Sequence, residues 1–470
     1  MDEYVEVITS LPIDRTFQYK VTGSESSAPE VGKRVYIPFR GRKRVGYIVE
    51  LEDKPVVAGP KPLIDVIDES PLFTGEMMAL AKWMKDYYLC SWGESLEAMI
   101  PGALKRGKVS MVSRVKEEEP AVLPTEPHKP NREQQRVLED INRCLDEGRH
   151  EVFLLHGITG SGKTEIYLQA MERVLAKGRS GIVLVPEISL TPQTVERFRS
   201  RFGEKVAVFH SKMLQSARFR EWKRIRDAEA RVVVGPRSAV FSPFQDPGIF
   251  IVDEEHEPSY KQEDVPRYHA REVAIKRAEM AGIPVILGSA TPSLESYHKA
   301  ANGRYRLVEL TQRIRERELP RVKLVDMRME FDTRVGKEII SRVMAEALRK
   351  DIKKQQQALV FLNRRGFSTF VNCRKCGFVI KCAVCDSPMV FHQEKKELIC
   401  HYCNRRKPPP KICPACNGDY LMYKGTGTQK VESVLKKILP GARIARMDSD
   451  TMSKRGAHHR VLKDFKDHKI

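Results

Sequence analysis

The middle of the chain carries short, nearly continuous apolar runs, separated by stretches long enough for helices. The runs are Val152–Leu155, Gly181–Val185, Val206–Phe209, Val232–Val234, Phe250–Val252 and Val285–Leu287. Strands of a parallel sheet have this pattern, because helices bury both faces of the sheet. We therefore expect an α/β domain over residues 131–315.

The N-terminal region instead alternates apolar and polar positions. The alternation covers Tyr4–Ile8, Arg34–Pro38 and Val45–Val49, and a helical pattern follows over Glu76–Tyr88. Half-buried strands alternate in this way. Residues 1–105 are thus predicted to form a β-rich domain closed by helices.

The rest of the chain divides at a charged, proline-containing segment, residues 106–130, which is typical of a linker. Residues 316–470 are predicted to hold a second, partial α/β unit with a cysteine-rich insertion at 373–416. Its expected strands are Lys323–Asp326, Ala358–Leu362, Leu421–Lys424 and Arg443–Met447, followed by a basic helix in 453–470. So short a unit should lack strands and leave an apolar sheet edge exposed.

Charge and hydropathy narrow the class of protein. Lys and Arg number 82 against 62 Asp and Glu, so the net charge is +20. This excess indicates a polyanionic partner such as nucleic acid, although a solvated basic surface would have the same charge. The chain has no apolar run of membrane-spanning length and no leader-like start, so we expect a cytoplasmic protein with no membrane partner.

A phosphate-binding loop follows the first apolar run of the α/β domain. Residues 157–164, GITGSGKT, match G-x-x-x-x-G-K-[ST] between a predicted strand and a predicted helix. Gly157, Gly160 and Gly162 would let backbone amides surround the phosphates of ATP. Lys163 would reach the β- and γ-phosphates, and Thr164 would bind Mg²⁺.

Three further segments complete a nucleotide site. Asp253 and Glu254 end an apolar strand, where Asp253 would hold Mg²⁺ and Glu254 would activate the attacking water. Ser289 and Thr291, in GSATP after another strand, could sense the γ-phosphate. Gln134 could read the adenine edge, or could simply lie at a solvated helix start.

Eight of the ten cysteines form four C-x-x-C pairs, which predict two structural zinc sites rather than disulfides. The spacing leaves the pairing open. Alternation over residues 386–399 predicts a hairpin, which would join Cys382 and Cys385 to Cys400 and Cys403. Cys373, Cys376, Cys413 and Cys416 would then share the second ion. His392 and His401 are interpreted as bystanders, because no ligand position is vacant.

In this order the motifs resemble the superfamily 2 helicases. The strings concerned are the Gln134 motif, GITGSGKT, LVPEISLTPQT (184–194), VGPRSAVFSPF (234–244), DEEH (253–256) and GSATPSLES (288–296). DEEHEPSYKQEDVPRYHARE, LNRRGF (362–367) and the paired cysteines after it narrow the resemblance to the PriA family of bacterial replication-restart helicases. The resemblance implies RecA-like P-loop lobes, an N-terminal DNA-binding domain, a zinc-ribbon insertion and the nested cysteine pairing.

The resemblance also implies an activity and partners. The family unwinds DNA 3′→5′ with ATP at stalled or abandoned forks and initiates primosome assembly. The expected partners are forked and single-stranded DNA, other primosome proteins, the replicative helicase loader and single-strand DNA-binding protein. By position, His256 would couple hydrolysis to DNA and Arg237 would contact a strand, although Pro236 replaces the usual Thr beside it. The expected cellular location is the cytoplasm, at the nucleoid.

Aromatic residues are candidates for stacking on bases. By resemblance Phe17 would stack on a 3′-terminal base, with Lys61 in the same pocket, and Tyr268 would lie in a DNA-sensing loop with Tyr260 and His269. Plain core positions are the alternative. Gln18 and Arg40 replace the family's Asp and Gly, so selection of a free 3′-OH is in question.

The second α/β unit departs from a whole helicase. We find no Gln-x-x-Gly-Arg-x-Gly-Arg string, and an arginine finger contributes roughly 10³–10⁵ to turnover in related enzymes. The winged-helix module and the C-terminal domain of the family are not found either. We therefore expect ATP binding with weak hydrolysis. The alternative hypothesis is a protein that binds forks and recruits partners without unwinding them.

Overall fold

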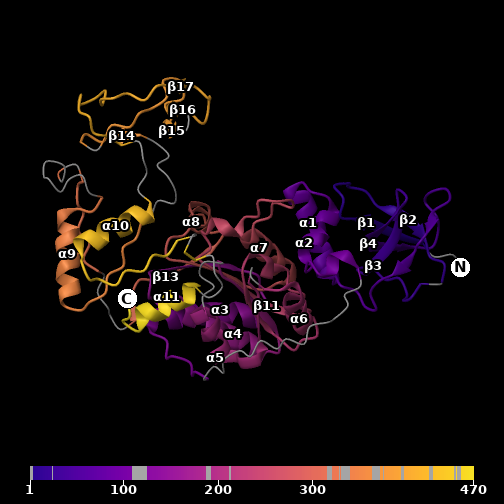
Figure 1. The fold of residues 1–470 in the computed structure, drawn as a ribbon. Helices are drawn as coiled ribbons and strands as arrows, with labels where there is room; N and C mark the ends of the chain where they lie inside the picture. The colour runs from indigo at the N-terminus through magenta and orange to yellow at the C-terminus, as the bar shows by residue number, and fades with distance from the viewer. Residues whose placement is uncertain are drawn as a thin grey trace. The chain divides into compact units, whose positions relative to one another are not determined.

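The computed structural model describes residues 4–23, 25–107, 124–186, 192–210, 213–314, 320–327, 329, 339–362, 371–373, 375–392, 396–422, 427–448, 451–452 and 457–470. The chain forms two compact units, Met1–Glu318 and Leu319–Ile470 (Figure 1).

A seven-stranded sheet, all of whose strand pairs are parallel, lies at the centre of the first unit. Its strands, in spatial order, are β13 (Arg306–Leu310), β7 (Val152–Gly157), β12 (Val285–Ser289), β11 (Pro247–Asp253), β8 (Ser180–Leu184), β10 (Val232–Gly235) and β9 (Val206–Val208). The six predicted runs are all strands. Only β13 was not predicted, because it is an edge strand in which exposed positions alternate with buried ones.

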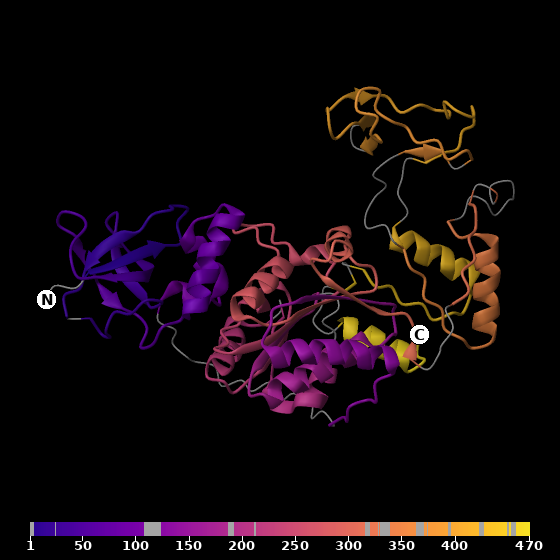
Figure 2. The same ribbon diagram turned by 180° about the vertical axis from the view of Figure 1, so that it is seen from behind.

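Helices cover both faces of this sheet, as the continuous apolar runs predict (Figures 1 and 2). One face packs on α3 (Arg132–Glu147), α4 (Lys163–Ala176) and α5 (Pro192–Phe202), and the other on α6 (Gln215–Arg226) and α7 (Ala270–Ala281). A short helix, α8 (Leu294–Ala301), precedes β13. Successive strand residues point to opposite faces, so Phe153 and Leu155 enter one core and Leu154 the other.

The N-terminal region is a six-stranded sheet followed by two α-helices and a short 3₁₀ helix. The strands, in spatial order, are β5 (Lys61–Pro62), β2 (Phe17–Lys20), β1 (Tyr4–Thr9), β4 (Arg42–Glu52), β3 (Arg34–Phe39) and β6 (Asp65–Val66). The helices are α1 (Gly75–Tyr88), α2 (Trp92–Met99) and the short 3₁₀ helix η1 (Leu104–Arg106). The three predicted strands and the predicted helix are confirmed.

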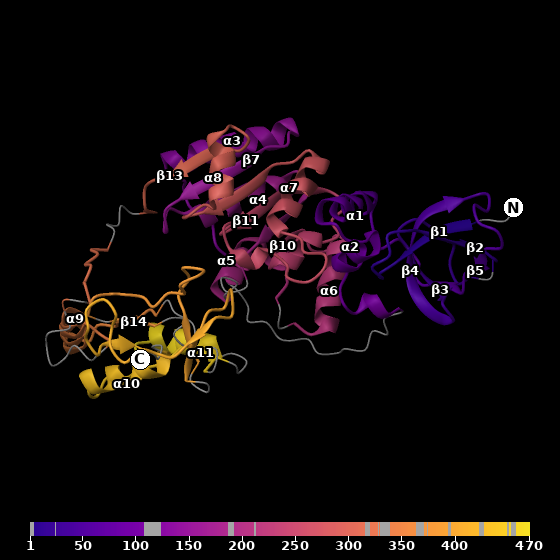
Figure 3. The ribbon, with the colours of Figure 1, turned by 90° about the horizontal axis from the view of Figure 1, so that it is seen from above.

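Helices α1 and α2 belong to the same hydrophobic core as α7 and one face of the parallel sheet (Figure 3). Arg277 of α7 is fully buried, and its guanidinium binds both carboxylate oxygens of Glu76 on α1, at 2.8 and 2.9 Å. The N-terminal region and the α/β domain are therefore joined by a packed interface.

The described residues of the second unit form a cysteine-rich region and the helices α9 (Arg342–Lys353), α10 (Thr428–Ile438) and α11 (Ala457–Lys466). The cysteine-rich region holds β14 (Asn372–Cys373) paired with β18 (Leu421–Met422), and a sheet of β15 (Val390–His392), β16 (Glu397–Ile399) and β17 (Arg406–Lys407). The predicted hairpin is confirmed, since β15 and β16 pair antiparallel.

The second α/β sheet is not present in the described part of this unit. Lys323–Asp326, Ala358–Leu362 and Arg443–Met447 are not strands, and the predicted strand at 421 pairs within the cysteine-rich region instead. An apolar run becomes a strand only where a neighbour completes its hydrogen bonds. Here Leu324 and Leu359 are 92% and 84% exposed.

Some predictions fall outside the described residues. They concern 108–123 of the linker, 187–191 of LVPEISLTPQT, 363–367 of LNRRGF, 423–424 of the expected strand Leu421–Lys424, and 453–456 of the basic tail. Among the described helices, none is long and apolar enough to span a membrane.

Candidate functional site

The predicted phosphate loop connects β7 to α4. Gly160 and Gly162 adopt φ of +85° and +88°, which residues with a side chain rarely reach. Lys163 begins α4, and its Nζ donates to the carbonyl oxygen of Gly157 at 2.7 Å. The loop is thus closed over its own lysine at the N-terminus of a helix, where phosphate oxygens bind favourably.

Gln134 lies against this loop rather than at a solvated helix start. Its side chain is 5% exposed, and Nε2 donates to the carbonyl oxygen of Ser161 at 3.0 Å while Oε1 accepts from the backbone N–H of Asn131. Both ends of the amide are occupied, so in this structure Gln134 positions the loop. Reading of adenine by Gln134 stays a prediction.

Asp253 ends β11, at the same edge of the sheet as the phosphate loop. Tyr167 of α4 donates to its Oδ1 at 2.9 Å, and Tyr260 donates to its backbone oxygen at 2.7 Å. Burial raises the pKa of Asp253 to about 6, and the neighbouring Glu254 acts in the same direction. A cation beside a buried carboxyl group stabilises its ionised form, so Asp253 suits the predicted role of Mg²⁺ ligand.

The predicted coupling residues lie together. His256 Nδ1 is 2.8 Å from Ser289 Oγ and 3.7 Å from a carboxylate oxygen of Glu254. Ser289 is fully buried, and its Oγ accepts the backbone N–H of Thr291 at 3.0 Å. A polar chain therefore links Glu254 at the end of β11 to the loop after β12.

Sequence reasoning missed Glu255, which is fully buried between Glu254 and His256. It accepts hydrogen bonds from Arg271 of α7, from the backbone N–H and hydroxyl of Ser293, and from the hydroxyl of Ser296 at the start of α8. Glu255 therefore fixes the acidic segment to two helices. The Arg and Ser residues that bind it are distant in the sequence, so no local pattern marks the role.

The residues predicted to contact DNA lie in different environments. Arg237 is half-buried and donates to the carbonyl oxygens of Ser259 and Lys261 at 3.3 and 2.7 Å. It lines a groove with the loop from Pro258 to Tyr268. Tyr268 is only 2% exposed and packs edge-on against Phe241. This burial favours the alternative of a core position for Tyr268, and stacking of Tyr268 on bases stays a prediction.

In the N-terminal sheet, Phe17 is half-buried on β2 and meets Phe39 edge-on, with ring centroids 5.1 Å apart. The guanidinium of Arg15 lies 4.8 Å from the centre of its ring. Lys61 is exposed on β5. Gln18 is buried and accepts from the backbone N–H groups of the segment at Val56, so it organises a loop.

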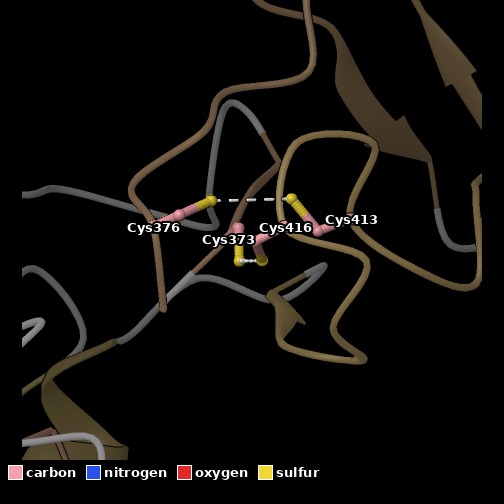
Figure 4. A group of neighbouring side chains, drawn as sticks. All are labelled: Cys373, Cys376, Cys413 and Cys416. Atoms are coloured by element: carbon pink, nitrogen blue, oxygen red, sulfur yellow. Dashed lines mark hydrogen bonds between the residues drawn. The ribbon is translucent and has the colours of Figure 1, made fainter.

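The eight paired cysteines form two groups of four, in the predicted nested arrangement. One group is Cys373, Cys376, Cys413 and Cys416, and the other is Cys382, Cys385, Cys400 and Cys403. In the first group two Sγ–Sγ distances are 3.6 Å (Figure 4), as is one in the second. Tetrahedral ligation with Zn–S bonds near 2.3 Å requires sulfur atoms about 3.8 Å apart, so both groups fit Zn²⁺.

Each C-x-x-C pair ends in the same tight turn. The residue after the second cysteine has a φ of 50–77° in every pair, namely Gly377, Asp386, Asn404 and Asn417. Its backbone N–H donates to the carbonyl oxygen of the first cysteine of the pair, at 2.9–3.0 Å. Gly, Asn and Asp tolerate this conformation best, which explains those residue types. His392 and His401 contact each other and belong to neither group.

These features define a P-loop nucleotide-binding protein with a zinc-binding region of eight cysteines. Models of three families match the chain: the PriA 3′DNA-binding domain over residues 6–101, the DEAD/DEAH box helicase over 131–300, and the PriA DNA helicase Cys-rich region over 382–408.

Similar curated proteins identify the family. Replication restart protein PriA of Bacillus subtilis (strain 168) is 37% identical over 98% of this chain and 74% of its own length. The Treponema pallidum (strain Nichols) protein of the same name is 37% identical over 100% of this chain and 70% of its own length. The chain therefore belongs to the PriA family and is an ATP-dependent DNA helicase.

Among solved structures, RecG bound to a three-way DNA junction aligns with 49% of this chain and 28% of its own, at 20% identity and a TM-score of 0.33. The Hef helicase domain of Pyrococcus furiosus aligns with 48% of this chain and 47% of its own, at 20% identity and a TM-score of 0.31. Both likenesses are too weak to carry an argument.

Proposed function

We propose that this protein unwinds DNA in the 3′→5′ direction at stalled or abandoned replication forks and initiates primosome assembly there. The observation that carries the proposal is the interface between α1, α2 and the helicase domain. A domain that matches the PriA 3′DNA-binding domain shares a hydrophobic core with the ATP-binding domain. A captured DNA end would therefore be held in a fixed relation to the motor.

In the proposed ATP site, the loop amides and Lys163 bind the phosphates, while Thr164 and Asp253 hold Mg²⁺. Mg²⁺, when bound, neutralises charge on the β- and γ-phosphates. Lys163 must leave the Gly157 carbonyl oxygen to reach a phosphate. Glu254 orients the attacking water and accepts its proton, and the contacts of His256 with Glu254 and Ser289 offer a route from hydrolysis to DNA binding.

On the DNA side, we propose that Phe17 and Lys61 bind the end of a nascent strand and that Arg237 contacts the translocated strand. Phe17 is half-buried, so part of its side chain stays accessible although it packs on Phe39. The zinc region is proposed to bind DNA or other primosome proteins, among them the replicative helicase loader and single-strand DNA-binding protein. Such a protein works in the cytoplasm, at the nucleoid.

The decisive experiment measures ATP hydrolysis by the purified chain with and without forked DNA. Hydrolysis stimulated by the fork should be lost in Lys163→Ala and kept in Lys205→Ala, which removes an exposed lysine far along the sheet from the loop. The direction of unwinding is measured with partial duplexes that carry either a 3′ or a 5′ single-stranded tail. Preferential unwinding of the duplex with the 5′ tail would contradict the proposed direction.

A second candidate function is fork binding and partner recruitment without unwinding. The observation that favours it is the lack of a second α/β sheet. In the described residues of the second unit, strands form only within the cysteine-rich region. Tight fork binding without stimulated hydrolysis, in a chain that retains two zinc ions, would select this alternative.

A further inference from the structure

The hairpin that joins β3 to β4 ends in an exposed basic tip. Its two turn residues, Arg40 and Gly41, have φ of +48° and +75°. Two consecutive residues with positive φ make the tight turn that keeps two twisted strands paired to their ends. Residues 40–44 are all exposed, and all except Gly41 are Arg or Lys. We call residues 40–44 the basic tip.

The charges of the basic tip are not neutralised within the described part of the chain, where none of its four cations forms an ion pair with an acid. Two of them lie over aromatic rings instead. Lys43 Nζ is 3.7 Å from the ring centre of Tyr36, and the guanidinium of Arg40 is 5.7 Å from that of Phe39. Four adjacent cations repel one another, so a bound polyanion would stabilise the tip.

The cations point to both faces of the ribbon. Arg42 pairs with Phe39, Lys43 with Pro38 and Arg44 with Ile37 in the antiparallel register. Successive side chains alternate between faces, so Arg42 and Arg44 lie on one face and Lys43 on the other, beside Tyr36. A ligand that meets only one face would leave part of this charge unused.

From this arrangement we propose that the basic tip enters a groove of duplex DNA and binds the phosphates on both sides of it. The major groove of DNA admits a two-stranded β-ribbon, and its walls are two phosphate backbones. An acidic peptide would contact one face and would not need the tight, protruding turn. The inference rests on the proposed action at forks, and adds a duplex-binding element next to the proposed end site.

The position of the tip fits this role. Phe39, which ends β3 immediately before the turn, contacts Phe17 edge-on at 5.1 Å. A duplex held by the tip would therefore lie beside a strand end at Phe17. Phosphates carry no sequence information directly, so binding by the tip should not depend on the DNA sequence.

The test replaces Arg42, Lys43 and Arg44 by Gln in one variant of the whole protein. The matched control replaces Lys350, Lys353 and Lys354 at the end of α9, which are also exposed, by Gln and so removes the same charge. Arg40 is kept, so that the turn is unchanged. The probe is a DNA duplex whose ends are closed by loops, and its binding is followed by fluorescence anisotropy over a series of salt concentrations.

For the tip variant we expect weaker binding and a slope of log K against log [salt] that is smaller by about 0.9 for each phosphate that the variant no longer binds. The control should keep the slope of the unsubstituted protein. Equal slopes in the two variants would overturn the inference. Loss of binding to a polyglutamate peptide, with duplex binding retained, would overturn it in favour of an acidic protein partner.

Hydrolysis of ATP stimulated by an open fork is measured on the same samples. If the tip variant keeps the salt slope and the stimulated hydrolysis of the unsubstituted protein, the proposed role of the basic tip is refuted and the proposed function is not. If the unsubstituted protein does not bind DNA, the proposed function is refuted as well.

Discussion

At the scale of single residues, the ATP site depends on contacts that its motifs do not reveal. Tyr167 and Tyr260 hold Asp253, and Gln134 holds the phosphate loop. Both tyrosines are almost completely buried. Aromatic side chains are commonly buried, so burial alone does not mark a role. The hydrogen bonds to Asp253 identify Tyr167 and Tyr260 as positioning residues.

The cap of α7 predicts a dependence of stability on pH. Nδ1 of His269 accepts the backbone N–H of Arg271, which requires a neutral ring. Burial lowers the pKa of His269 from 6.5 to about 4, and the charge of Arg271 acts in the same direction. Between these values the unfolded chain binds a proton that the folded chain does not, so the free energy of unfolding should fall as pH decreases from 6.5 toward 4.

Chemical unfolding across this range measures the effect. His269→Asn keeps a cap acceptor without a titrating ring, so it should reduce the loss of stability in acid. His128→Asn, at an exposed histidine, should leave that loss unchanged. The same acid dependence in all three proteins would show that His269 does not cause it.

Gly288, at the end of β12, has no room for a side chain. A Cβ there would lie 1.7 Å from the hydroxyl oxygen of Tyr167, which binds Asp253. We expect Gly288→Ala to cost about 1–3 kcal/mol in stability through overpacking, and to weaken Mg·ATP binding by displacing Tyr167. Urea unfolding and nucleotide titration measure the two effects.

Gly75→Ala is the control, since a Cβ at Gly75 meets no atom within 4 Å. It should leave stability unchanged or slightly higher. If Gly288→Ala behaved in the same way, the close approach of Tyr167 would not constrain the site.

At the scale of elements, an apolar run in the sequence became a strand only where a neighbouring strand pairs with it. The apolar runs of the parallel sheet are strands because each has a parallel partner and a helix on both faces. Similar runs at Lys323–Asp326 and Ala358–Leu362 are not strands, because no partner strand lies beside them in the described residues. The packing of α1 on α7 joins residues 201 positions apart, which no local pattern contains.

The contact between α1 and α7 predicts a large effect of a single substitution. Glu76→Ala leaves the guanidinium of Arg277 buried, with the carbonyl oxygens of Val240 and Ser242 as its remaining hydrogen-bond partners among the described residues. Removal of one partner from a buried ion pair costs about 3–5 kcal/mol. We expect a loss near the lower limit, because the Glu76 side chain is 22% exposed.

The loss is measured by urea unfolding beside Glu69→Ala, which removes an exposed acid of the same region. A similar, small change in both variants would indicate that the ion pair does not hold α1 to α7.

At the scale of the whole molecule, the two units have different sources of stability. The first unit contains the large hydrophobic cores, whereas the cysteine-rich region has a small core in which cysteine side chains take part. A domain with so little apolar surface needs metal ligation to fold.

We therefore expect two zinc ions for each chain and a selective response to their removal. Cys373→Ser and Cys382→Ser should each lose one ion, and Cys144→Ser, outside both groups, should lose none. Chelation should make the cysteine-rich region sensitive to protease while the first unit keeps its unfolding transition. Metal analysis and limited proteolysis check this, and one ion lost from Cys144→Ser would contradict it.

The sequence by itself determined the class of fold, the phosphate loop, the acidic pair and the zinc ligands. Each of these depends on residues within one strand, turn or C-x-x-C pair, so local spacing carries the information. The tertiary structure decided what distant residues do to one another. It buried Tyr268, placed Gln134 on the loop, fixed Glu255 between two helices and joined α1 to α7. Burial and ion pairing depend on which segments meet, and only the packed chain settles that.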